Sequence, residues 1–352
     1  MTIDRTPRLR AERLHGAHQA LLEQTQCHFQ ARDGAPLVMT RRRLPGAAPR
    51  AALLLVHGLC QNRYSWHLSD RSLAGWLAAE GYDVFTLELR GHGLSRAAGS
   101  PYPQGFADYV DYDAPAAIDA AARISGQARV FWIGHSLGGM IGYCLGPASA
   151  RLAGLVALGS PAAFGVDNPV LPALGWLLHA LDRATPLRYW RFRRFPSTPF
   201  ARLLLALQPW LERPGNRFPL QLWVPGSFQP RALRERLRLG FDHTGRAVIE
   251  QMFLEWARRH NFRDRRSGED YTQRFAWLDL PLLLLYGNRD RVAAAQTAEP
   301  LRARVPSRDC TVQTLGGDDG VDFGHLDLVL GEQAPAQVWP LLRDWLHARS
   351  QR

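Results

Sequence analysis

The chain has 352 residues, of which 46% are hydrophobic and 21% are charged. This composition is typical of a globular protein with a large core, and it excludes a disordered chain or one that needs a metal or disulfide to fold. The formal net charge is +11, and all 43 basic residues are arginines. The arginines are scattered, and no zinc-finger, helix-turn-helix or RNA-binding motif accompanies them, so we attribute the charge to residue usage and expect no nucleic-acid partner.

The four cysteines lie far apart and form no CxxC pair: Cys27, Cys60, Cys144 and Cys310. This spacing favours a reducing compartment over a disulfide framework. The first 30 residues lack the apolar segment and cleavage site of a signal peptide, and no run approaches the roughly 18 to 20 apolar residues that span a bilayer. We therefore expect a cytoplasmic protein, and leave contact with a membrane surface open.

The N-terminal third predicts a helix followed by strands. Residues 8–25 show a helix-like alternation of apolar and charged positions, and residues 28–46 predict two strands around an Asp33-Gly34 turn. Residues 51–58 and 81–95 each begin with a buried strand that ends in a glycine-containing loop. Residues 65–80 between them predict a helix.

The strand–helix alternation then returns at residues 128–146 and 151–161, which predicts an α/β fold with a mostly parallel sheet flanked by helices. From 162 to 275 the rhythm gives way to a tract rich in Arg, Trp, Pro and Leu, which we interpret as a helical cap insertion. Alternation resumes over 280–305 and 310–331, before a closing amphipathic helix at about 336–349. We therefore divide the chain into core residues 1–161 and 276–352, with a cap at 162–275.

Ser136 is the strongest candidate for a catalytic residue. It lies in the motif GHSLGG at 134–139, between a strand and a helix. A nucleophile on such a tight turn takes strained backbone angles, which the flanking glycines relieve, and the helix N-terminus faces the charge that develops on the substrate. The motif in this context predicts a serine nucleophile.

A serine hydroxyl needs a base, and His325 is the best of the twelve histidines. It follows the last predicted strand, and the chain order nucleophile, acid, histidine is the one this type of site uses. His57 and His92 lie in earlier strand-end loops, and His135 is part of the serine turn itself.

Asp290 is the candidate acid that orients His325, because it follows a buried strand and precedes the histidine in sequence. Four other aspartates are rivals: Asp318, Asp319, Asp322 and Asp327. We expect Asp322 and Asp327, which flank the histidine, to form surface turns or hydrogen bonds within the loop. The oxyanion hole would use the backbone N–H groups of Leu59 and Leu137.

These residues resemble the α/β-hydrolase superfamily, and within it the acid lipases and the monoacylglycerol-lipase-like serine esterases. The resemblance covers about two thirds of the chain and leaves the cap unmatched. The stretches that carry it are 57–66, 87–96, 111–120, 134–139, 287–293 and 324–338. A serine at position 136 disfavours the polyester synthases, which have cysteine there, and the epoxide hydrolases and haloalkane dehalogenases, which have aspartate.

The resemblance implies hydrolysis of carboxylic esters of lipid-like or apolar acyl substrates through an acyl-enzyme, with no cofactor or metal. Cap tryptophans would line an acyl-binding pocket or simply pack on one another: Trp176, Trp190, Trp210 and Trp223. The arginine–aromatic run at 188–195 could contact an anionic membrane. Two alternatives stay open, an acyltransferase that uses the same acyl-enzyme and a non-catalytic binding protein of this fold. The sequence does not determine the oligomeric state.

Overall fold

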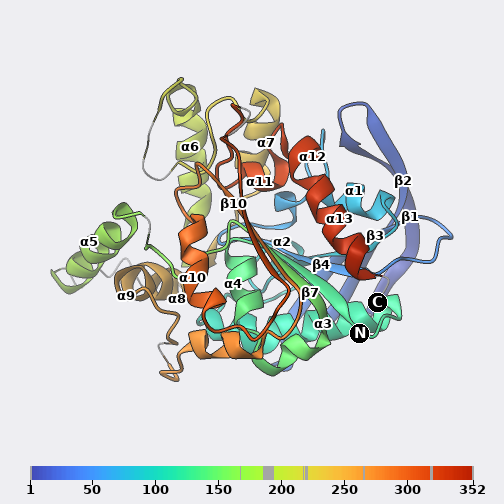
Figure 1. Ribbon diagram of the computed structural model, residues 1–352, viewed down its shortest axis with the longest axis horizontal. Coiled ribbons are helices and arrows are strands. Elements are labelled where there is room, and N and C mark those ends of the chain that lie inside the picture. The colour runs from blue at the N-terminus through green and yellow to red at the C-terminus, as the bar shows by residue number, and fades with distance from the viewer. Residues whose placement is uncertain are drawn as a thin grey trace.

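The computed structural model describes residues 2–166, 168–184, 194–216, 218, 221–264, 266–317 and 320–350. Its centre is a nine-stranded sheet with the order β1-β2-β3-β5-β4-β6-β7-β10-β11 (Figure 1). The strands are β1 Thr2–His15, β2 His18–Gln30, β3 Pro36–Arg43, β4 Ala52–Val56, β5 Asp83–Glu88, β6 Val130–His135, β7 Leu152–Leu158, β10 Leu282–Gly287 and β11 Cys310–Leu315. From β5 to β11 along that order, all neighbouring strands are parallel. The predicted α/β class is confirmed.

The N-terminal segment is an antiparallel hairpin, so the helix predicted over residues 8–25 is wrong. β1 pairs with β2, β2 with β3, and β3 with β5, all antiparallel. Glu12 and Leu14 are buried whereas Ala11 and Arg13 are exposed, and this period of two belongs to a strand. Over so few residues, the alternation of apolar and charged positions fits the period of a helix as well as that of a strand. The pairing of β1 with β2 decides for the strand.

The strands at the centre of the sheet are buried on both faces, which explains their unbroken apolar runs. In β4, Leu53 and Leu55 contact one hydrophobic cluster and Leu54 and Val56 the other. Helices α1 Leu73–Ala79 and α13 Trp339–Ser350 pack in the first cluster, and α3 Ala114–Ser125 and α4 Leu137–Tyr143 pack in the second. α13 confirms the predicted closing helix. α1 begins eight residues later than expected, where the Ser72 side chain caps it by accepting a hydrogen bond from the Gly75 N–H.

Between β7 and β10 the chain is mostly helical, as expected of residues 162–275. The described helices here are α5 Val170–Ala184, α6 Ser197–Leu211, α7 Pro230–Leu239, α8 Arg246–Ile249, the π-helix η5 Glu250–Trp256, α9 Ala257–Arg259 and the 3-10 helix η6 Tyr271–Trp277. A short antiparallel pair, β8 Arg194–Phe195 and β9 Thr244–Gly245, lies among them. α5 and α6 both lie on the side of the molecule away from the β1–β2 hairpin (Figure 1), where α5 packs on η5 and α9, and α6 packs on α7. The division into core and cap at these boundaries stays a prediction. No helix within the described ranges is long and apolar enough to cross a membrane.

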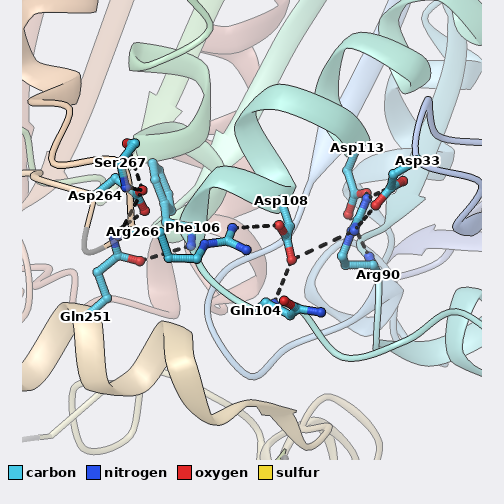
Figure 2. A network of polar contacts seen from close by, with 10 residues as sticks. All are labelled: Asp33, Arg90, Gln104, Phe106, Asp108, Asp113, Gln251, Asp264, Arg266 and Ser267. Carbon is cyan, nitrogen blue, oxygen red and sulfur yellow. Dashed lines mark hydrogen bonds and ion pairs between the residues drawn. The ribbon is translucent and has the colours of Figure 1, made fainter.

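A network of arginines and aspartates joins this inserted segment to the core (Figure 2). Arg90, in the loop after β5, donates to Asp113 at 2.7 Å and to Asp33 at 2.6 Å. Asp108, 3.8 Å from Arg90, accepts a hydrogen bond from Arg266 of the inserted segment at 2.9 Å. Burial raises the pKa of Asp113 to about 7 even though Arg90 opposes the shift. These charged contacts hold the end of the inserted segment against the loop that follows β5.

Candidate active site

Ser136 occupies the sharp turn between β6 and α4 that the motif predicts. Its φ of 52° and ψ of −118° place it in a strained region of backbone conformation. A Cβ added to Gly134 would lie 2.3 Å from the Gly138 carbonyl carbon, and one added to Gly138 would lie 2.1 Å from the Val56 carbonyl oxygen. Only glycine fits at these two positions, so the turn depends on both.

His325 lies in the loop between β11 and α11 Asp327–Leu330, where it pairs with Asp290. Its Nδ1 is 2.8 Å from Asp290 Oδ2, and both side chains are buried. The backbone oxygen of His325 lies 3.0 Å from the Nε2 of His135, the residue before Ser136, and the two imidazole rings are 4.7 Å apart. The histidine–aspartate pair is therefore held beside the serine turn. Within the described residues no hydrogen bond joins Ser136 Oγ to His325.

Asp290 is fixed on both of its oxygens. Oδ1 accepts hydrogen bonds from the backbone N–H groups of Val292 at 2.8 Å and Ala293 at 3.0 Å, while Oδ2 faces His325. A Cβ on Gly159, just after β7, would come within 2.9 Å of Asp290 Oδ2 and 3.1 Å of His325 Nδ1. The pair therefore also needs a glycine at the end of β7, which sequence analysis did not identify.

Of the rival aspartates, Asp322 and Asp327 lie within the described residues, and Asp318 and Asp319 lie outside them. Asp322 accepts hydrogen bonds from Asn288 at 2.6 Å and Arg289 at 3.0 Å. Asp322 is partly exposed, as expected, but its partners lie in the loop after β10 and not in its own loop.

Asp327 differs from its expected surface position, because it is buried and reaches beyond its own loop. Its carboxylate accepts from the Gly324 N–H at 2.6 Å, the Val224 N–H at 2.9 Å and the Ser227 hydroxyl at 2.6 Å. Burial raises the pKa of this carboxyl to about 7. A second link joins the same segments, since the Leu326 N–H donates to the Leu222 carbonyl at 2.8 Å. The loop that carries His325 is thus bound to residues 222–227 of the inserted segment.

The loop with Leu59 lies beside Ser136, as an oxyanion hole requires. A Cβ on Gly58 would be 3.1 Å from the Ser136 Cβ, and Leu137 is the first residue of α4. His57 supports this loop from behind: its Nδ1 lies 2.9 Å from the Gly58 oxygen, and its Nε2 accepts from the Leu89 N–H at 3.2 Å. A neutral imidazole protonated on Nδ1 satisfies both contacts.

Three buried histidines around the site should make the fold sensitive to acid. Burial lowers the pKa of His57 to about 3 and that of His92 to about 4, and it lowers the pKa of His135 well below its ordinary value. Because the unfolded chain binds protons at these positions below about pH 6.5 and the folded chain does not, stability should fall as pH drops from about 6.5 to 4. We expect a loss of about 1.4 kcal/mol per pH unit for each histidine, in urea unfolding at a series of pH values. Asp113 and Asp327, whose pKa values burial raises, add stability over the same pH range and offset the loss from two of the three histidines. A stability that rises towards pH 4 would therefore contradict the neutral assignment.

The cap tryptophans proposed to bind substrate occupy different surroundings. Trp223 is buried, donates from Nε1 to Glu212, and has its backbone next to Gly324 in the His325 loop. Trp176 is 56% exposed, with the Arg258 guanidinium 3.8 Å from its ring centre. Trp210 is also largely exposed, and Trp190 lies outside the described residues. Of the described three, Trp223 is therefore the one next to the histidine loop.

No group of three or more His, Cys, Asp and Glu side chains could hold a metal ion in the part of the chain that the structure describes. A serine, a histidine–aspartate pair and backbone N–H groups are chemical groups that together can perform acyl transfer.

Comparison with known proteins agrees with this geometry. Residues 47–199 match the family described as serine aminopeptidase, S33. The chain is 24% identical over 335 residues to lipase member K of Mus musculus, covering 83% of this chain and 78% of that protein. It is 31% identical over 104 residues to the human lysosomal acid lipase/cholesteryl ester hydrolase, covering 27% of this chain and 26% of the relative.

Solved structures show the same fold. The monoacylglycerol lipase of Paleococcus ferrophilus is 19% identical and superposes with a TM-score of 0.54, over 89% of this chain and 99% of that one. The sheet order, the turn at Ser136 and the similarity to these proteins all indicate the same fold. The chain shares the fold of this monoacylglycerol lipase and is similar in sequence to lipases.

Proposed function

We propose that this carboxylic ester hydrolase cleaves esters of apolar, lipid-like acyl chains through a Ser136–His325–Asp290 triad. The observation that carries the proposal is the buried His325–Asp290 pair, 2.8 Å apart, at the strained turn of Ser136. A buried carboxylate that faces Nδ1 places the remaining imidazole nitrogen, Nε2, in the role of base.

In the proposed mechanism, Ser136 Oγ attacks the ester carbonyl carbon while His325 Nε2 takes the hydroxyl proton. The negative charge on the carbonyl oxygen is stabilised by the N–H groups of Leu59 and Leu137 at the start of α4. His325 then gives its proton to the departing alcohol, which leaves an acyl group on Ser136. Water, deprotonated by the same histidine, attacks this acyl-enzyme and releases the acid.

Apolar surface on the inserted segment supports a lipid-like substrate. One face of α6 carries four large apolar side chains that are at least 41% exposed: Phe200, Leu203, Leu207 and Trp210. A lipid-like acyl chain is the kind of ligand that such a surface would attract. Contact of residues 188–195 with an anionic membrane stays a prediction, because residues 188–193 lie outside the described ones.

A series of p-nitrophenyl esters from acetate to palmitate tests the proposed substrate class. Each methylene group buried in an acyl pocket contributes about 0.8 kcal/mol, so kcat/KM should rise about fourfold per carbon until the pocket is filled. The chain length at which the rise stops measures the pocket. Equal kcat/KM for all esters would contradict an apolar acyl site while leaving ester hydrolysis intact, and failure to cleave any of them would contradict the proposed activity.

A further inference from the structure

A polar pocket of about 390 Å³ lies over the outer strands of the sheet, apart from Ser136, His325 and Asp290. Strands β1, β2 and β3 supply one part of its wall, and residues of the loops after β4 and β5 supply the rest. Four of its lining residues are arginines and none is acidic. The arginines are Arg8, Arg10, Arg42 and Arg63, and Gln24, Gln26 and Thr40 lie beside them.

Arg42 is the buried charge of this pocket. It pairs with Gln24 of the neighbouring strand in the sheet register, so the two side chains lie on the same face. Only 4% of Arg42 is exposed, and its Nη1 has no hydrogen-bond partner among the residues that the structure describes. A buried guanidinium N–H without an acceptor is costly and calls for a partner that the protein itself does not supply.

Arg8 and Arg10 stand on β1 at the edge of the pocket, and both are exposed. Arg8 is opposite Gln24 in the register of the hairpin. Within the described ranges, no carboxylate lies within ion-pair distance of either arginine, whereas Arg41 and Arg43, nearby on β3, each pair with one. The two arginines are therefore free to bind a negative charge in the pocket.

The charges around the pocket leave an excess of two positive units. Two carboxylates adjoin the lining: Glu12 is 3.0 Å from Arg42, and Glu88 is 3.0 Å from Arg63. Burial alone would raise the pKa of Glu12, but Arg42 and His67 hold it well below its usual range, so Glu12 stays ionised. Four arginines minus two carboxylates leave +2, without counting His67. A doubly charged anion would balance this excess.

We infer that this pocket binds a dianionic phosphate group, either free phosphate or the phosphomonoester of a larger molecule. The planar fork of an arginine donates two parallel hydrogen bonds to phosphate oxygens, which favours this ligand over a simple halide. The amide and hydroxyl groups of Gln24, Gln26 and Thr40 add neutral donors. The volume leaves room for more than the phosphate itself, which agrees with a phosphorylated small molecule or a lipid headgroup.

Titration calorimetry on the full chain tests this site, with sodium phosphate and sodium sulfate as probes at a constant ionic strength of about 0.15 M, where distant surface charges are screened. The test variant is Arg8→Gln/Arg10→Gln, which changes the edge of the pocket and leaves the buried Arg42–Glu12 pair intact. The matched control is Arg231→Gln/Arg234→Gln on the exposed face of α7, which removes the same charge elsewhere. Thermal unfolding checks that both variants remain folded.

Vesicle sedimentation distinguishes the two sources of phosphate. Phosphatidylcholine vesicles that contain phosphatidic acid present a phosphomonoester, and vesicles with phosphatidylglycerol at equal surface charge present a diester. Saturable binding of free phosphate, weakened at least tenfold in Arg8→Gln/Arg10→Gln and unchanged in the control, supports a soluble ligand. Binding to phosphatidic acid alone, with the same dependence on the variants, supports a headgroup. If neither probe binds, or if the two double variants weaken binding equally, the site does not exist.

Discussion

Replacing Ser136 with alanine is expected to lower kcat for ester hydrolysis on the order of a million-fold. In the proposed mechanism the loss is this large because the hydroxyl forms the acyl-enzyme, and His325 and Asp290 have nothing to activate without it. Ser136 lies on a turn held by Gly134 and Gly138, and a methyl side chain fits wherever a hydroxymethyl one does. The fold should therefore survive. Steady-state hydrolysis of the best p-nitrophenyl ester measures the effect.

Ser149→Ala is a matched control, because this buried serine also loses a hydroxyl but lies in the segment before β7. Its Oγ donates to the Gly146 and Trp277 carbonyls, so we expect a loss of about 1 kcal/mol in stability and full activity. Activity retained in Ser136→Ala would contradict the assignment of the nucleophile.

Adding an alcohol to the wild-type reaction separates the hydrolase from the acyltransferase alternative. Free acid as the main product supports the hydrolase, and a new ester as the main product supports the acyltransferase.

Asp327→Ala is expected to lower kcat about a hundredfold with a much smaller change in KM. The variant loses the two hydrogen bonds that tie the His325 loop to Val224 and Ser227 and a third, within the loop, from the Gly324 N–H. The Val224 and Gly324 N–H groups are then left without acceptors. A shift of about 1 Å in a catalytic group is sufficient for such a loss of rate. Stability should fall by about 2 to 5 kcal/mol. Steady-state kinetics and urea unfolding measure the two effects.

Asp327→Asn is the matched control, because an asparagine can keep the same contacts. Its amide oxygen can accept from Gly324 and Val224 in place of Oδ2, and its NH₂ group can donate to the Ser227 hydroxyl. We expect activity within a few-fold of wild type. A loss in Asp327→Asn as large as that in Asp327→Ala would show that the negative charge matters and that our positioning argument is wrong.

The same asparagine should change the pH dependence of stability. Since the folded chain holds a proton on Asp327 up to a pKa of about 7 and the unfolded chain releases it near its ordinary value, wild-type stability should lose a contribution as pH rises from about 4 to 7. The side-chain amide of Asp327→Asn does not ionise between pH 4 and 7. The free energy of unfolding of this variant should therefore not show this decrease.

Local sequence was sufficient to predict the central parallel strands of the sheet and the serine turn. Continuous apolar runs predict strands buried on both faces, and β4, β5, β6 and β10 are such strands. The glycines around Ser136 specify a turn that tolerates no Cβ at either position. These features depend on residues within one turn or one strand, which is why the fold class and the location of the serine could be predicted.

Tertiary structure decided the features that depend on distant partners. Residues 8–25 form the end of β1 and the beginning of β2. They are extended because these two strands pair with each other and β2 also pairs with β3. Asp327 is buried because Val224 and Ser227, about a hundred residues earlier, supply its hydrogen bonds. The arginine-lined pocket likewise gathers side chains from strands and loops far apart in sequence. A sequence pattern reports the period of a segment and the chemistry of its side chains, whereas burial and charge pairing arise only when separate segments meet.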